Sequence, residues 1–248
     1  MAHAMRAGRE RRFARMTESE WLAGDLAAQL RFAQSRLSPR RQRLLAVAMC
    51  RAAAPEHADV RAALDVIENC ADGTAPPGEV ERARQRCREI AQQAYEVYRH
   101  ALETGGSTST PAIVEVAWAT SFAANTPVPL TSIAERLGLP VYLLPLGDDG
   151  AAEPDTVWSD LAAPLRALVL EVAGNPFREV PFDPDWRTDT ARALARQMYD
   201  RREFSAMPIL ADALQDAGCD NDDVLNHCRD PRQVHVRGCW VLDAVLGL

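Results

Sequence analysis

The sequence predicts a mainly α-helical fold, built as a single helical domain of about eight to ten helices. Apolar residues recur at intervals of three and four along most of the chain, which is the spacing of one helix face. Capping residues precede several of these stripes, among them Thr17 with Glu20 three positions later, and Ser38 directly before Pro39. A strand-like run occurs near 140–145, so we expect at most a short strand pair there.

The N-terminal part of the chain is predicted to form four helices in succession. The first follows the capping box at Thr17 and reaches Leu37, and the second begins at Pro39. The third ends at Gly73, and the fourth runs from about residue 78 to residue 103. Cys70 and Cys87 fall on the apolar faces of these helices, where a free thiol behaves as a small packing residue.

Residues 104–160 are predicted to be an irregular insertion. The stretch from Gly105 to Pro111 is rich in glycine, serine and threonine, as expected of a loop. Residues 132–138 have the pattern of the first helix of a helix-turn-helix. The sequence that follows is strand-like and flanked by prolines, so it offers no second, recognition helix.

Residues 175–248 are predicted to form a C-terminal helical motif. A proline-rich connector precedes a helix capped near Thr188, and further helices start near Ser205 and Asp220. The last helix is expected to begin near Pro231, because Asp230 suits an N-cap and Gln233 stands at the third helical position.

Composition excludes several classes of function. All 28 basic residues are arginine, so there is no lysine for a Schiff base or a phosphate-binding loop. The net charge of −7 argues against nucleic-acid binding by the protein as a whole. No run approaches the roughly 18 apolar residues of a membrane helix, and no secretion signal is visible. We therefore expect a cytoplasmic protein with reduced thiols.

Residues 1–15 differ from the rest because five arginines face a single acid there. The segment has no apolar periodicity, which predicts a disordered leader before Met16. Its charge leaves contact with nucleic acid open as an alternative role.

One cluster of residues is able to carry metal chemistry. Cys219, His227, Cys228, His235 and Cys239 fall within 21 positions near the C-terminus. On the predicted last helix, His235 and Cys239 are four residues apart and share one face. Cys219, His227, His235 and Cys239 would form a Cys₂His₂ set suited to structural zinc, although the spacing matches no common zinc finger. Cys228 points about 100° away from His227 and is expected in the core.

Two other interpretations of the cluster stay open. Buried cysteines and helix-end histidines are often ordinary core residues. A catalytic pair of Cys239 with His235 or His227 is the second alternative, although no oxyanion loop accompanies it.

Several motifs resemble those of a known family. They are the stretches from Met16 to Leu22, from Arg43 to Arg51 and from Val66 to Gly73, and in the C-terminal part Gly174–Arg178, Pro208–Leu214, Gly218–Cys219 and His235–Trp240. Together they resemble a large, uncharacterised bacterial family abundant in planctomycete-type genomes, over roughly residues 17–100 and 165–248. The resemblance implies no activity, but it implies that Cys219, His227, His235 and Cys239 belong to a shared motif.

The function predicted from the sequence is a non-enzymatic helical interaction or scaffold module, stabilised by a structural zinc. Its partner is expected to be another protein, since no small-molecule site is recognisable. A metal- or thiol-dependent hydrolase that uses the C-terminal cluster is the alternative, and nucleic-acid contact through the arginine-rich leader is the second alternative.

Overall fold

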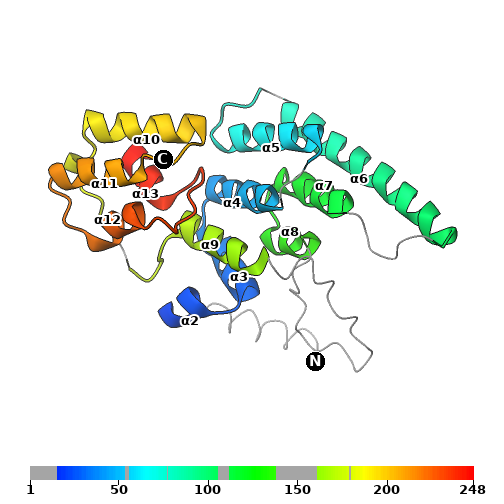
Figure 1. Cartoon of the computed structure of the whole chain (residues 1–248), viewed down its shortest axis with the longest axis horizontal. Coiled ribbons are helices and arrows are strands. Elements are labelled where there is room, and N and C mark those ends of the chain that lie inside the picture. Colours follow the sequence, from blue (N-terminus) through cyan, green and yellow to red (C-terminus); the bar gives the residue numbers. More distant parts are fainter. Residues whose placement is uncertain (1–15, 54–55, 77, 106–111, 138–160, 179) are drawn as a thin grey trace. The chain divides into compact units, whose positions relative to one another are not determined.

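The computed structural model describes residues 16–53, 56–76, 78–105, 112–137, 161–178 and 180–248 (Figure 1). Within these ranges most residues are helical and no strand occurs, which confirms the mainly α-helical prediction. The arginine-rich leader and the strand-like run near 140–145 lie outside the described residues.

The chain divides into two compact units. Among the described residues, unit 1 comprises Met16 and the stretch from 23 to 166, and unit 2 comprises residues 17–22 and the stretch from 167 to 248. Unit 2 is therefore assembled from two separated stretches of the sequence. The boundary at residues 166 and 167 falls inside a single helix, α9 (Ala162–Ala173).

Unit 1 is built from six helices in addition to the start of α9. They are α3 (Leu26–Arg36), α4 (Pro39–Ala52), α5 (Ala58–Ala71), α6 (Glu79–Glu103), α7 (Ala112–Ala123) and α8 (Leu130–Arg136). The expected cap at Ser38 is present, because its hydroxyl accepts a hydrogen bond from the Arg41 amide. The core includes the fully buried side chains of Leu45, Met49 and Ile67.

The predicted first helix is interrupted. The capping box forms, with Thr17 and Glu20 joined in both directions, but the helix α2 (Glu18–Ala23) ends before Gly24. The Asp25 carboxylate then caps α3 by accepting a hydrogen bond from the Ala28 amide. A second cap inside the apolar stripe thus makes two helices from one. The described residues contain twelve α-helices in all.

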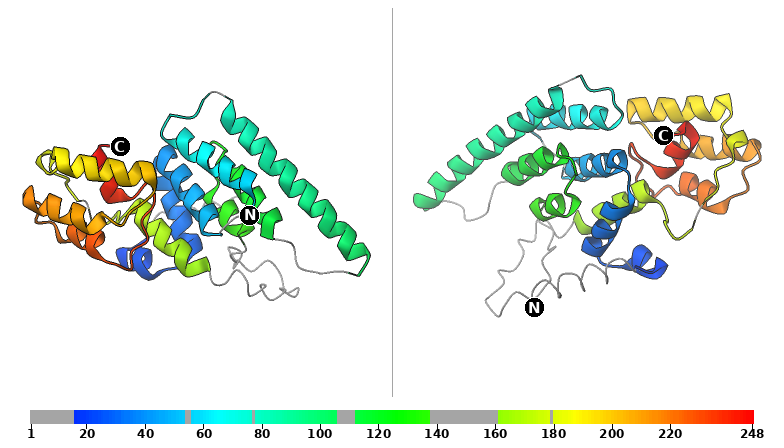
Figure 2. Two further views of the ribbon diagram at one scale, coloured as in Figure 1. Left: turned by 45° about the horizontal axis from the view of Figure 1, so that its top comes forward. Right: turned by 180° about the vertical axis from the view of Figure 1, so that it is seen from behind.

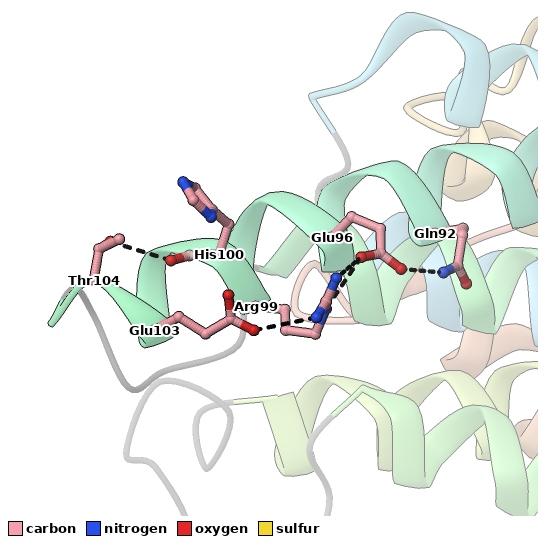
Figure 3. A network of polar contacts seen from close by, with 6 residues as sticks. All are labelled: Gln92, Glu96, Arg99, His100, Glu103 and Thr104. Atoms are coloured by element: carbon pink, nitrogen blue, oxygen red, sulfur yellow. Dashed lines mark hydrogen bonds and ion pairs between the residues drawn. The ribbon is translucent and has the colours of Figure 1, made fainter.

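The longest helix, α6, packs against α5 and α7. Its C-terminal end extends past the end of α7 (Figure 2). On this part of the helix, Arg99 binds the carboxylates of Glu96 and Glu103, one turn before and after it (Figure 3). All three side chains are more than two-fifths exposed, so the network is a surface feature.

Unit 2 contains the remaining helices. After α2 and the end of α9 come η2 (Pro184–Trp186), α10 (Asp189–Arg201), α11 (Met207–Asp216), α12 (Asp222–Arg229) and α13 (Trp240–Leu246). The predicted cap at Thr188 is present on α10, where its hydroxyl accepts from the Ala191 amide. Buried side chains from α10 to α13 form one continuous core, with Met198, Leu214 and Leu242 among its members.

Helix α2 is fastened to the C-terminal end of α9. The indole of the fully buried Trp21 donates a hydrogen bond of 3.0 Å to the Gly174 carbonyl oxygen. The carboxylate of Glu18 accepts hydrogen bonds from Asn175 and Arg178. These contacts explain why a six-residue helix at the start of the chain belongs to unit 2.

Candidate metal site

Glu171 is a fully buried acidic residue near the C-terminal end of α9. Leu168 and Val172 of that helix are buried, and Glu171 between them has no exposed surface. A buried carboxylate needs partners, because an unpaired charge in the interior is very unfavourable. Glu171 accepts from Gln233 at Oε2, 3.1 Å away, and it also contacts two histidines.

His227 comes from the last turn of α12. Asn221 caps this helix by accepting a hydrogen bond from the Val224 amide, and the buried Val224 is one turn before His227. The ring is held on both sides. Its Nε2 lies 3.2 Å from Glu171 Oε2, and its Nδ1 accepts a 3.2 Å hydrogen bond from the indole N–H of Trp240.

His235 and Cys239 do not share a helix, which corrects the prediction of a last helix starting near Pro231. Asp230 ends α12, and its carboxylate accepts from the amide of Arg232 in a turn. The chain stays irregular until Trp240, and Gly238 adopts a positive φ of 91°. A left-handed residue cannot continue an α-helix, so α13 starts only after it.

The irregular segment before α13 is held in place by long-range contacts. Arg237 donates to the backbone carbonyls of Tyr199 and Asp200 at the end of α10, at 2.7 and 3.2 Å. Farther back, His235 Nδ1 lies 3.1 Å from Glu171 Oε1. Cys239 then caps α13 with its backbone and directs a fully buried thiol to His227, with 3.3 Å between Sγ and Nε2.

Glu171, His227, His235 and Cys239 form a group able to hold a metal ion. One ligand atom from each residue lies within 4.8 Å of all the others. The three contacts of 3.1 to 3.3 Å between carboxylate, imidazole and thiol approach the roughly 3.3–3.6 Å that separates ligand atoms around tetrahedral zinc with bonds of 2.0–2.3 Å. The histidine ring centroids are 5.1 Å apart.

The electrostatics of the group are those of a buried acid beside two bases. Burial acts to raise the pKa of Glu171, but hydrogen bonds from His227 and His235, and their charges when protonated, lower it to about 2. Burial and the nearby carboxylate of Glu171 raise the pKa of the Cys239 thiol well above its usual value. The carboxylate is thus ionised, and the thiol keeps its proton in the absence of a cation.

Cys219 is not part of this group. It is buried in the core of unit 2, at the turn between α11 and α12, where its amide donates to the Leu214 carbonyl oxygen. Cys228 is also in the core, as expected, and burial raises its pKa to about 12. The structure thus brings together three of the four residues chosen from the sequence and supplies Glu171 as the fourth.

The sequence contains one indication that Glu171 is unusual, and it lies outside the C-terminal cluster of cysteines and histidines. Glu171 is the single charged residue between Ala167 and Gly174, in an otherwise apolar run. An isolated acid on the buried face of a helix needs a partner. Its partners, His227 and His235, lie 56 residues or more farther along the chain (227 − 171 = 56). Residue spacing within one helix cannot predict a contact between positions so far apart.

Comparison with protein-family models, curated proteins and solved structures found no match to this chain. Among the described helices, none is both long enough and apolar enough to cross a membrane.

Proposed function

We propose that this protein is a non-enzymatic helical interaction or scaffold module whose unit 2 is stabilised by a structural zinc ion. The proposed ligands are Glu171, His227, His235 and Cys239. The observation that carries the proposal is the convergence of four ligand atoms of zinc-binding type, from three separate parts of unit 2, within 4.8 Å.

Charge balance supports a divalent cation. A metal bound by the Cys239 thiolate and the Glu171 carboxylate has its two positive charges matched by two negative ones, and neutral imidazoles complete the set. The resulting cluster carries no net charge, which favours its burial. Thiolate and imidazole together favour zinc over magnesium or calcium, which prefer oxygen ligands.

The enclosure of the group supports a structural role over a catalytic one. Glu171 and Cys239 have no exposed surface, and the side chains of His227 and His235 are about one-tenth exposed or less. Catalytic zinc sites keep a position open for water or substrate, whereas structural sites have four protein ligands. A buried thiol with a raised pKa is also a weak nucleophile, which disfavours a thiol-dependent hydrolase.

The decisive experiment measures metal content and stability together. Full-length protein is purified without chelator, and zinc is quantified by elemental analysis in the wild type and in Cys239→Ser, Cys219→Ser and Cys228→Ser. We expect about one zinc per chain in the wild type and in the Cys219 and Cys228 variants, and strongly reduced zinc in Cys239→Ser. Cys228→Ser is the matched control, because it changes a neighbouring buried thiol outside the group.

Two outcomes would count against the proposal. If the wild type binds no zinc even when refolded with it, the group is a buried hydrogen-bond network and not a metal site. If Cys219→Ser loses zinc and Cys239→Ser retains it, the ligand set is the one expected from the sequence and not the one proposed from the geometry.

An enclosed metal site is not accessible to other molecules, so contacts with a partner would be made by the outer surfaces of the helices. This supports the scaffold role. We propose a protein partner for these surfaces and a cytoplasmic location. Membership of the uncharacterised bacterial family likewise stays a proposal, supported by the motifs between Gly174 and Trp240. The alternative of nucleic-acid contact concerns residues 1–15, outside the described residues.

A further inference from the structure

The hydrogen bond between Trp240 and His227 determines where the His227 ring carries its proton. The indole N–H is only a donor, so His227 Nδ1, which it contacts at 3.2 Å, must act as an acceptor. A neutral imidazole that accepts at Nδ1 has its hydrogen on Nε2. That N–H is directed at Glu171 Oε2 and Cys239 Sγ, 3.2 and 3.3 Å away.

A metal ion in the group requires the opposite arrangement. Nε2 is the ring atom that faces the other ligands, so it must offer its lone pair and cannot carry hydrogen. The hydrogen of the neutral ring then resides on Nδ1, directly opposite the Trp240 N–H. The N–H of His227 Nδ1 and the indole N–H of Trp240 would then both be donors, so the hydrogen bond between the two rings is lost. One of the two rings must move away, or its N–H is left without an acceptor.

We propose that Trp240 is a positioning residue that controls metal binding: its hydrogen bond to His227 holds the ring in the form that does not bind metal, and this bond breaks when a divalent cation binds. The inference rests on the proposed metal site. When zinc binds, one proton leaves the Cys239 thiol for solvent, and the His227 proton is exchanged from Nε2 to Nδ1. No bond to carbon changes and no electron is transferred.

Loss of the hydrogen bond between Trp240 and His227 would also affect the packing of unit 2 around Gly174. Its indole packs against Gly174, next to the carbonyl oxygen that accepts the hydrogen bond from Trp21. Because Trp240 is only partly buried, rotation of its side chain can take the N–H away from His227. Trp240, a residue outside the metal group, thus connects occupancy of the site with the contact between α9 and α2.

The first test follows the proton itself. Long-range ¹H–¹⁵N NMR spectra of the full chain report which nitrogen of each histidine carries hydrogen. We expect His227 to be protonated at Nε2 in chelator-treated protein and at Nδ1 after one equivalent of zinc. The indole N–H signal of Trp240, assigned with Trp240→Phe, should shift with zinc, and that of Trp186 should not. An Nε2-bound proton on His227 in the zinc-loaded protein would overturn the inference.

The second test measures affinity by zinc titration against a competing chelator. Trp240→Phe keeps an aromatic ring but removes the N–H, so we expect zinc to bind about tenfold more tightly than to the wild type, as follows from one mismatched buried donor. If Trp240 only stabilised the structure of the site, Trp240→Phe would weaken zinc binding instead. Trp186→Phe is the control, since Trp186 packs in the same core against Phe182 and should leave affinity unchanged.

The two proposals fail in different ways. If cobalt added to the wild type gives no thiolate-to-metal absorption band, the metal site itself is disproved. If the band appears, and Trp240→Phe binds zinc as weakly as the wild type or more weakly, the site stands and the role of Trp240 is wrong. Should Trp240→Phe fail to fold, the NMR measurement on the wild type still decides the question.

Discussion

Gly174 lies directly against the indole of Trp240: a Cβ atom at Gly174 would be 3.2 Å from Cγ of that ring. Gly174 also has a positive φ of 65°, in the left-handed region where other residues are strained. It therefore has two separate reasons to be glycine, one in the backbone and one in the packing.

Gly174→Ala should lower the free energy of unfolding by about 1–3 kcal/mol, since the methyl group adds a close contact to the backbone strain. Urea denaturation of full-length protein measures the loss. Gly218→Ala is the control, because Gly218 has a φ of 90° but nothing within 4 Å of an added Cβ. Equal losses of unfolding free energy in the two variants would show that the indole of Trp240 can move aside without destabilising the protein.

Zinc affinity should rise with pH. The pKa of the Cys239 thiol is raised well above its usual value, so the thiol is protonated at neutral pH and its proton must leave when metal binds. One displaced proton corresponds to about a tenfold gain in affinity for each pH unit between about 7 and 9. Competition titrations at several pH values measure the slope. A flat profile over that range would mean that the thiol is already ionised or is not a ligand.

Removal of metal should loosen unit 2 more than unit 1. The proposed ligands hold α9, α12 and the segment before α13 together, whereas none of them comes from unit 1. Hydrogen exchange of the full chain, with and without chelator, should show faster exchange in α12 and α13 and unchanged exchange in α4 and α5. Uniform acceleration in all four helices would contradict a site confined to unit 2.

Arg43 in unit 1 should contribute more to the free energy of unfolding than an arginine in an exposed ion pair. Its guanidinium donates to the Asn125 carbonyl oxygen and the Thr126 hydroxyl, at 3.2 and 2.8 Å. Arg43→Met should cost about 1–3 kcal/mol of unfolding free energy, because the partly buried carbonyl oxygen of Asn125 loses a charged donor. Arg99→Met, the exposed control on α6, should cost about 0.5 kcal/mol or less. Thermal or urea unfolding compares the two, and equal losses would refute the distinction.

Local signals in the sequence predicted several helix starts correctly, whereas residues 104–160, predicted to be an irregular insertion, contain α7 and α8. Ser38, Thr188 and the pair of Thr17 with Glu20 act as caps where their chemistry suggested. A cap is a bond between residues two or three positions apart, so its evidence lies within one short stretch of sequence.

The site required information that local patterns do not contain. Asp230 before Pro231 fits a helix start, yet it equally fits the turn that the structure shows. The choice between them depends on distant partners, such as Glu171 for His235 and the end of α10 for Arg237. For the same reason, residue types alone favoured Cys219 as a fourth ligand, whereas in the tertiary structure the fourth member of the group is Glu171.

The assembly of unit 2 from both ends of the chain has a consequence for protein synthesis. Glu18 and its partner Asn175 are 157 residues apart, so at 5–20 residues per second the ribosome completes the second roughly 8 to 30 s after the first. During this interval Trp21, which is fully buried in the finished protein, has no Gly174 to bind. Unit 1 is translated in between and is free to fold first. Helix α2 can therefore reach its final position only after the end of α9 has been synthesised.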